Sequence, residues 1–177
     1  KRSVALDLHS PDGQDVFRDL ASNADVLLEN YRPGTLERIG LGYKTLSARN
    51  PKLIYCSISG FGRTGPYRDH GGFDLVAQAM SGLMSLTGNP QGPPVKVGVP
   101  ITDLNAGMYA CYGILAAYIQ RMNTGEGQLV DTSLLEAGIA YTFWESAIYF
   151  ATGTVPGPLG SAHRLTAPYQ ALRAMDG

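Results

Sequence analysis

The sequence of 177 residues has few charged side chains and no dominant sign of charge. Only 16% of the residues are charged, and fourteen lysines and arginines against fifteen acidic residues give a net charge of −1. Nucleic-acid binding requires clustered basic side chains that neutralise phosphates, and no basic run of that kind occurs. We therefore expect no nucleic-acid partner. Because 44% of the residues are hydrophobic, we also expect a folded chain.

Cysteine is scarce, and long apolar runs are missing. Cys56 and Cys111 lie among apolar neighbours, which favours buried thiols in a reducing compartment over a disulfide. A membrane helix needs about eighteen consecutive apolar residues, whereas the longest candidate, residues 106–119, is shorter and rich in glycine and alanine. These features predict a cytoplasmic protein without a membrane segment or a signal peptide.

Residue patterns for metal, serine-hydrolase and dinucleotide chemistry are also missing or incomplete. The three histidines, His9, His70 and His163, are far apart, and no cysteine or histidine pair has metal-ligand spacing. No Gly-x-Ser-x-Gly motif occurs. Residues 60–65, Gly-Phe-Gly-Arg-Thr-Gly, match the dinucleotide fingerprint, but residues 66–72 have loop composition where the fingerprint needs a helix. We expect no metal, and no nicotinamide or flavin cofactor.

Strand and helix patterns alternate along the chain. The sequence predicts strands at residues 4–8, 24–30, 52–59 and 169–175, and helices in the first half at residues 11–22, 35–39 and 44–49. Residues 60–72 are expected to form a loop, with a further helix starting at Phe73. This alternation is typical of an α/β fold with a Rossmann-like parallel sheet covered by helices.

Two longer helices are expected in the second half. Residues 102–121 form the longest helical pattern, and its small residues lie on one face, which predicts close packing against another helix. Those small residues are Ala106, Ala110, Gly113 and Ala117. Residues 133–151 are apolar nearly all round, which predicts a buried helix. The linker composition of residues 153–162 suggests a core domain over residues 1–152, followed at residues 153–177 by a linker and the start of another domain.

Asp103 is the acidic residue with the most informative position. It lies between Ile101 and Leu104, where a loop rich in glycine and proline meets the longest helix. As a structural residue, its carboxylate would accept hydrogen bonds from the free N–H groups of the helix start. As a chemical group, a carboxylate shielded from water at this place could attack a thioester carbonyl. The residues alone leave both interpretations open.

Seven short motifs give the chain a family resemblance. They are Lys1-Arg2-Ser3-Val4-x-Leu6-Asp7, residues 25–34 (Asp-Val-Leu-Leu-Glu-Asn-Tyr-Arg-Pro-Gly), residues 55–62 (Tyr-Cys-Ser-Ile-Ser-Gly-Phe-Gly), Thr64-Gly65-Pro66, Gly72-Phe73-Asp74, Thr102-Asp103-Leu104-x-x-Gly107 and Gly125-x-Gly127-Gln128-x-Val130-Asp131. In this order and spacing they resemble the class III coenzyme A transferase family, the CaiB/BaiF type, over essentially the whole chain.

The resemblance implies the large domain of an interlocked homodimer, truncated at both ends. It also implies transfer of CoA from an acyl-CoA to a carboxylic acid, with CoA thioesters as substrates and no metal. The donor and the acceptor acid stay open. We expect these 177 residues by themselves to be inactive and prone to associate.

The resemblance further implies site residues. Asp103 matches the family's catalytic aspartate, which attacks the acyl-CoA carbonyl to give a mixed anhydride and then an aspartyl-CoA thioester, before the acceptor acid reacts. The expected CoA-binding residues are Leu6, Asp7, Leu8, His9, Asn30, Tyr31, Arg32, Arg38, Gly71, Gly72, Phe73 and Asp74.

Two other functions stay open. A racemase or epimerase of 2-methylacyl-CoA would need an acid/base pair. The racemases of this family carry a Gly-His-Asp motif where this chain has Gly72-Phe73-Asp74. Phenylalanine cannot transfer a proton as that histidine does. His70 could substitute only if its loop folded back towards Asp103. The remaining alternative is a non-catalytic fragment that binds CoA.

Overall fold

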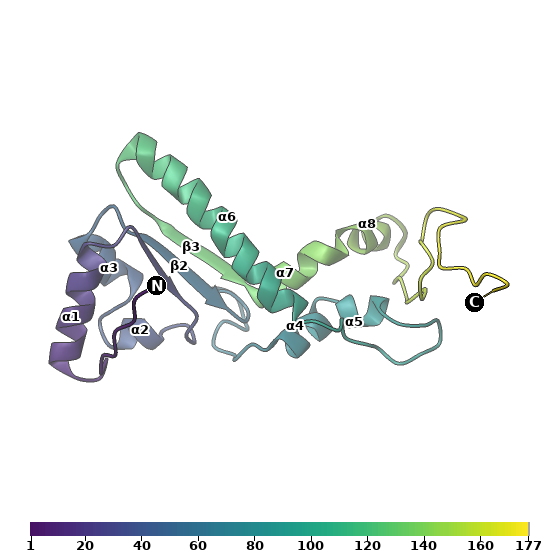
Figure 1. The fold of residues 1–177 in the computed structure, drawn as a ribbon, viewed down its shortest axis with the longest axis horizontal. Helices are drawn as coiled ribbons and strands as arrows, with labels where there is room; N and C mark the ends of the chain where they lie inside the picture. The colour runs from purple at the N-terminus through teal and green to yellow at the C-terminus, as the bar shows by residue number, and fades with distance from the viewer. Residues whose placement is uncertain (177) are drawn as a thin grey trace.

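The computed structural model describes residues 1–176 and has a parallel β-sheet at its centre (Figure 1). Strands β1 (Val26–Glu29), β2 (Ile54–Ser59) and β3 (Leu129–Ser133) are hydrogen-bonded in that order, and both pairs are parallel. Helices connect each strand to the next, so the predicted α/β fold with a parallel sheet is confirmed.

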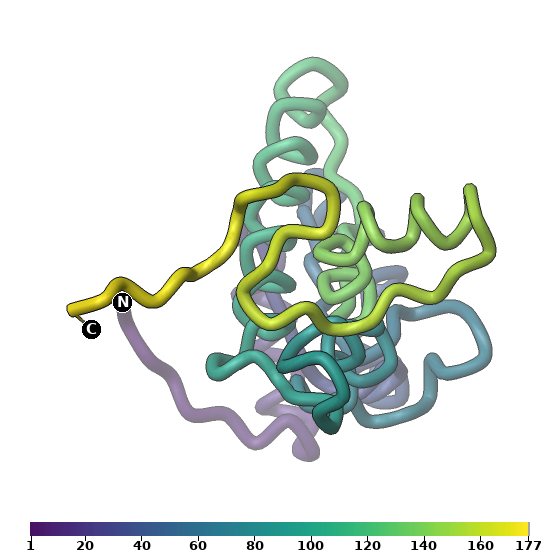
Figure 2. The backbone as a smooth tube through the Cα atoms, turned by 90° about the vertical axis from the view of Figure 1, so that its right-hand side faces the viewer, coloured from purple at the N-terminus to yellow at the C-terminus, as the bar shows by residue number. Residues whose placement is uncertain are grey.

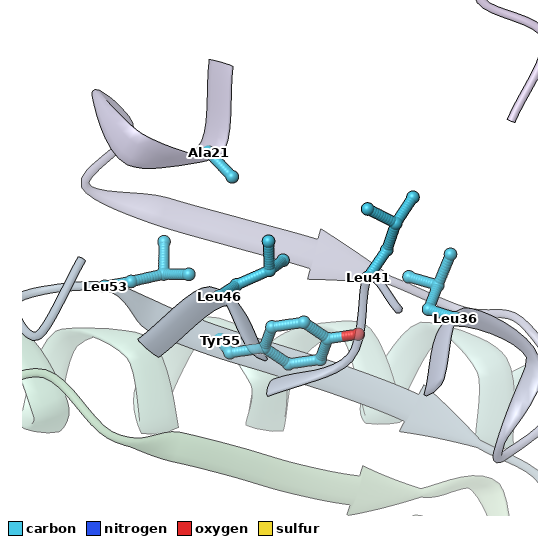
Figure 3. Packing of buried hydrophobic residues seen from close by; sticks show 6 residues of the cluster. All are labelled: Ala21, Leu36, Leu41, Leu46, Leu53 and Tyr55. Carbon is cyan, nitrogen blue, oxygen red and sulfur yellow. The ribbon is translucent and has the colours of Figure 1, made fainter. Parts of the chain in front are cut away.

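One face of the sheet packs against three helices, which are α1 (Pro11–Ser22), α2 (Thr35–Arg38) and α3 (Tyr43–Arg49). Helix α1 starts where the sequence indicates, because the Ser10 side chain accepts a hydrogen bond from the Gly13 amide at 3.1 Å and proline occupies the first helical position. The core between these helices and the sheet is almost entirely aliphatic (Figure 3). It consists of Ala21, Leu36, Leu41, Leu46, Leu53 and Tyr55.

Helix α6 (Ile101–Thr124) lies along β2 and β3 (Figure 1). Its predicted small-residue face is buried at Ala106, Ala110 and Ala117. A Cβ atom at Gly113 would lie 2.6 Å from Val130 Cγ1 of β3, so this face allows close approach of the sheet. The predicted packing of this face against another helix is confirmed for α7 (Leu134–Ile139). The same face also packs against the sheet, which was not predicted.

Three other elements complete the described chain. Helices α4 (Asp74–Met80) and α5 (Leu83–Leu86) follow the loop after β2, and the 3₁₀ turn η1 (Ala140–Thr142) joins α7 to α8 (Phe143–Thr152). Residues 153–176 form neither helix nor strand, and the C-terminal residues run away from the packed elements as an open loop (Figure 2). The proposed domain boundary at residue 152 stays a prediction.

The prediction of one buried helix over residues 133–151 is wrong. The segment divides into α7, η1 and α8, and no residue of α8 is buried in the described chain. Helix α8 extends beyond the sheet (Figure 1). Its apolar side chains therefore stay largely exposed, and Phe150 is 84% exposed. Cys56 is buried as expected, but Cys111 is exposed, because it lies off the buried face of α6.

The strand predictions at both ends are also wrong. Residues 4–8 and 169–175 have no strand assignment, since neither segment joins the ladder of the described sheet and a strand requires a hydrogen-bonded neighbour. Within residues 1–176, none of the helices combines the length and the apolar character that crossing a bilayer requires.

Candidate active site

A cavity of about 510 Å³ lies at the carboxyl ends of the three strands. The strands point towards the place where α4, α7 and the start of α6 meet (Figure 1). The cavity is lined by residues at or just after the end of each strand. These are residues 30–33 after β1, Ser59 at the end of β2, Gly60 after it, and Leu134 after β3. Ligand sites in parallel sheets are characteristically found at this edge.

The cavity brings together several predicted site residues from distant parts of the chain. Asn30, Tyr31 and Arg32 come from the loop after β1 and Asp103 from the first turn of α6. The loop before α4 contributes a third group: Gly71, Gly72 and Phe73. The cavity therefore contains a carboxylate, a guanidinium group and two aromatic side chains.

Six predicted site residues do not line this cavity: Asp74, which is described below, and five residues that lie elsewhere. Leu6 and Leu8 line a separate apolar groove of about 430 Å³ beside α1 and β1. Asp7 and His9 are exposed in the turn before α1, where the His9 amide donates to Asp7 Oδ1 at 2.9 Å. Arg38 is exposed on α2 and donates to Thr35 Oγ1 at 3.1 Å. Their role in CoA binding stays a prediction.

Two glycines form a backbone crossing in the cavity wall. A Cβ atom at Gly60 would lie 2.7 Å from the Gly72 nitrogen, and one at Gly72 would overlap the Gly60 Cα atom. The loop after β2 and the loop before α4 can therefore touch only because both residues lack a side chain. Arg32 lies close to the same loop, since its Nη2 atom would be 3.3 Å from a Cβ at Gly71.

Asp74 caps helix α6 from the neighbouring helix α4. Its Oδ1 atom accepts hydrogen bonds from the Thr102 amide at 2.9 Å and the Thr102 hydroxyl at 2.8 Å. Its Oδ2 atom accepts one from Nε2 of the buried Gln78 at 2.7 Å. Burial acts to raise the pKa of Asp74, but the hydrogen bonds from Thr102 and Gln78 outweigh it and hold this pKa below its ordinary value. Asp74 is also a predicted site residue, and its carboxylate is directed to α6.

Asp103 has a different environment from Asp74. Within the described residues its carboxylate accepts no side-chain hydrogen bond, and the capping role that it might have had belongs to Asp74. Partial burial, followed by the negative charge of Asp74, raises the pKa of Asp103. The expected shielding from water is wrong for this chain, because Asp103 is exposed. The two carboxylates thus have pKa values shifted in opposite directions, which is common where they have separate chemical roles.

Comparison with known proteins decides the family. The sequence matches CoA-transferase family III over residues 1–177. The chain belongs to CoA-transferase family III. It is 45% identical to a succinate–glutarate CoA-transferase of Agrobacterium fabrum and 42% identical to the human succinyl-CoA:glutarate CoA-transferase, in both cases over its whole length. It covers 44% and 40% of those two proteins, so it spans less than half the length of these relatives.

A solved structure supports the same assignment. A CaiB/BaiF family protein from Brucella suis superposes on this family III chain with a TM-score of 0.92 at 42% identity. The match covers 100% of this chain and 47% of the other. The family resemblance carried by the seven motifs is therefore confirmed, and so is the α/β fold with a parallel sheet.

His70, which could act in acid/base chemistry only if its loop folded back towards Asp103, also lines the cavity of this family III chain. Its loop folds back so that His70 and Asp103 line the same cavity. The imidazole ring packs against Tyr67, with ring centres 5.1 Å apart, and against Phe61 at 6.3 Å. Nothing in the local sequence predicts this path of the loop.

The remaining unpredicted lining residues follow a simpler rule. Pro33, Ser59, Gly60 and Leu134 stand at or just after strand ends, and Ile58 and Gly107 lie beside them. The carboxyl-end rule for parallel sheets would have indicated the first four. The dinucleotide fingerprint at residues 60–65 opens no helix, since the chain stays irregular until α4 begins at Asp74. Within residues 1–176 no group of three metal-ligating side chains occurs.

Proposed function

We propose that this chain carries the acyl-CoA site of a CoA transferase that moves CoA from an acyl-CoA to a carboxylic acid, with Asp103 as the nucleophile. The main support is that a carboxylate with a raised pKa, to which no side chain of the described residues donates a hydrogen bond, lines the cavity at the strand ends. A carboxylate with a raised pKa is more basic, and so a better nucleophile, than an ordinary aspartate. Family membership supplies the reaction class.

In the proposed reaction an Asp103 oxygen attacks the thioester carbonyl, the C–S bond breaks and CoA leaves as a thiolate. The product is a mixed anhydride of Asp103 and the acyl group. The thiolate then attacks the Asp103 carbonyl of the anhydride and releases the first acid, which leaves CoA on Asp103 as a thioester. The acceptor carboxylate attacks the carbonyl of this thioester, the C–S bond breaks, CoA leaves again as a thiolate, and a second anhydride forms. CoA thiolate finally attacks its acyl carbonyl and frees Asp103.

Side chains around the cavity suit the two substrates. Arg32 offers a planar fork of donors for a carboxylate or a phosphate, and Tyr31, which is 52% exposed, offers an aromatic face. The partial positive charge at the start of α6 favours negative charge that develops on the attacked carbonyl oxygen. The names of the two relatives support small dicarboxylic acids such as succinate and glutarate as substrates.

The complete protein is proposed to act as a homodimer in the cytoplasm. Large apolar side chains on the outer faces of α6 and α8 are exposed in the described residues, and a second subunit would cover them. Prominent members are Leu115, Ile119, Met122, Phe143 and Phe150. Alone, these 177 residues are expected to associate and to lack transferase activity.

Substitution of Asp103 in the full-length protein tests the nucleophile. Asp103→Asn is expected to abolish acyl transfer while the Kd for CoA changes by no more than a few-fold, because the amide has nearly the same shape but is not a nucleophile. Hydroxylamine added with acyl-CoA should convert Asp103 of the wild-type protein to a hydroxamate that mass spectrometry locates. If Asp103→Asn retains half the activity, the covalent scheme is incorrect.

Proton exchange is the second candidate function, and the position of His70 in the cavity favours it. His70 and Asp103 would serve as the acid/base pair of a 2-methylacyl-CoA epimerase. Incubation of a 2-methylacyl-CoA in D2O separates the two functions. A transferase leaves the α-carbon unlabelled at the catalytic rate, whereas rapid deuteration that disappears in His70→Ala would favour the epimerase.

A further inference from the structure

Two acidic residues lie in one row across the sheet, next to the candidate site. Glu29 of β1 pairs in register with Ser57 of β2, and Ser57 pairs with Asp131 of β3. Residues in register project to the same face of a sheet, so Glu29 and Asp131 flank the serine on one face. Glu29 is only 8% exposed. A buried carboxylate is costly unless a cation or hydrogen-bond donors compensate it.

Arg63 is the cation at this row. It lies in the loop after β2, where Gly62 has a φ of +85° and its amide donates to Ser59 Oγ at 2.9 Å. The Arg63 backbone amide donates to Asp131 Oδ2 at 3.1 Å, and its Nη1 atom donates to Ser57 Oγ at 3.4 Å. Nη1 also lies 3.8 Å from Glu29 Oε1.

Arg63 compensates a third carboxylate as well. Its Nη2 atom forms a hydrogen-bonded ion pair with Glu37 of α2. Partial burial acts to raise the pKa of Glu37, but the hydrogen bond from Arg63 helps to outweigh this and lowers it. Arg63 therefore neutralises acidic groups of β1 and α2 with its guanidinium group and contacts β3 with its backbone amide.

Glu29 connects this cluster to the cavity. Its Oε2 atom accepts a hydrogen bond from the Tyr31 amide at 2.8 Å. Tyr31 and its neighbours Asn30 and Arg32 line the cavity, whereas neither Glu29 nor Arg63 does. The loop that lines the cavity is thus tied to a buried carboxylate that is paired with Arg63.

We propose that Arg63 is a positioning residue that acts through Glu29 to hold the Asn30–Arg32 loop in the conformation that binds the CoA thioester. This role rests on the proposed function. Without the guanidinium group, the buried Glu29 carboxylate loses its neighbouring cation and turns towards water, and its hydrogen bond to the Tyr31 amide weakens. Substrate binding is affected first, because the reacting Asp103 belongs to a different element, α6.

The test uses the full-length protein with three variants: Arg63→Met, Arg63→Lys and the double variant Arg63→Met/Glu29→Gln. Arg49→Met is the matched control, because Arg49 forms an exposed ion pair with Asp19 at 3.6 Å on the α1 and α3 helices. Hydrogen–deuterium exchange of the peptide over residues 29–36 reports the Tyr31 amide. Calorimetry gives the Kd for CoA, and steady-state kinetics give kcat.

Arg63→Met is expected to speed exchange of the Tyr31 amide and to raise the Kd for CoA, each about tenfold, as loss of one hydrogen bond to a charged group implies. The kcat at saturating acyl-CoA should stay within about twofold, since groups that act only in binding leave it unchanged. Lysine restores part of both effects. The double variant restores slow exchange, because the glutamine oxygen accepts from Tyr31 without a buried charge.

Unchanged Tyr31 exchange in Arg63→Met would overturn the proposal, as would a double variant that exchanges as fast as the single one. If Arg63→Met does not fold, as judged by circular dichroism, the lysine and double variants give the same decision. Exchange and CoA binding are measured without acyl transfer. A wild-type protein that binds CoA but transfers no acyl group therefore refutes the proposed function and leaves the role of Arg63 to be decided by its own readouts.

Discussion

Removal of the Asp74 carboxylate should loosen the start of α6 and displace Asp103 from the cavity. In Asp74→Ala, helix α6 loses its cap from the Thr102 contacts at 2.8 and 2.9 Å, which costs about 0.5–2 kcal/mol for a typical N-cap. The fully buried Gln78 loses the closer of the two acceptors of its Nε2 atom and keeps only the Val99 carbonyl at 3.4 Å, which costs about 1–3 kcal/mol more. We therefore expect the free energy of unfolding to fall by about 2–4 kcal/mol, allowing for overlap between the two terms.

Urea denaturation of the full-length protein measures this loss, and kcat reports the displacement of Asp103. Asp74→Asn is the informative companion, because its oxygen can still accept from Thr102 while its NH2 group faces the Gln78 amide. Gln78 cannot simply turn over, since its Oε1 atom accepts from the Val97 amide at 2.8 Å. Because its pKa is lowered, Asp74 stabilises the fold above its unfolded pKa, and this contribution disappears as pH falls through the lower native pKa. A loss below about 0.5 kcal/mol in Asp74→Ala at neutral pH would refute the capping argument.

Two further predictions concern the same cavity. The proposed mechanism requires ionised Asp103, whose pKa is raised by burial and then by Asp74, so activity should fall with decreasing pH at a higher pH than for an ordinary aspartate. Asp74→Asn should move this acid limb of the pH–rate profile to lower pH, and an unmoved limb would contradict the assignment. Gly72→Ala places a methyl group on the Gly60 backbone, so we expect a stability loss of about 1–3 kcal/mol and a higher KM for acyl-CoA. Gly157→Ala, which meets nothing within 4 Å, is the control and should change neither quantity.

Local signals were sufficient for the first half of the fold. The Ser10 cap and the following proline define the start of α1, and the run of isoleucine, tyrosine and serine in β2 identifies a strand that is buried along most of its length. Residues 4–8 alternate in the same way as a strand but form none, because strand formation depends on a neighbouring chain segment rather than on the pattern alone. Strand β3 was not predicted, since Asp131, Thr132 and Ser133 interrupt its apolar pattern.

The candidate site was predictable to a similar degree. Asp103 and the residues around Tyr31 follow from the motifs, because each motif lies beside a strand end or a helix start. His70 and the contact between Asp74 and Thr102 could not be predicted in this way. Both depend on how loops fold in space over a separation of 28 residues or more, which no periodicity in the sequence records. The prediction that Asp103 is shielded from water was wrong for the same reason, since the burial of a residue depends on all the segments packed around it.

The crossing of Gly60 and Gly72 limits how the cavity can be redesigned. At that point the wall consists of main chain alone, so it has no rotamers to adjust and no side chain to exchange for a larger or more polar one. A different substrate preference must instead come from positions that carry side chains, such as Tyr31, Phe73 and Leu134. Libraries that vary these three positions and leave both glycines unchanged are therefore the efficient way to alter which acyl group the enzyme accepts.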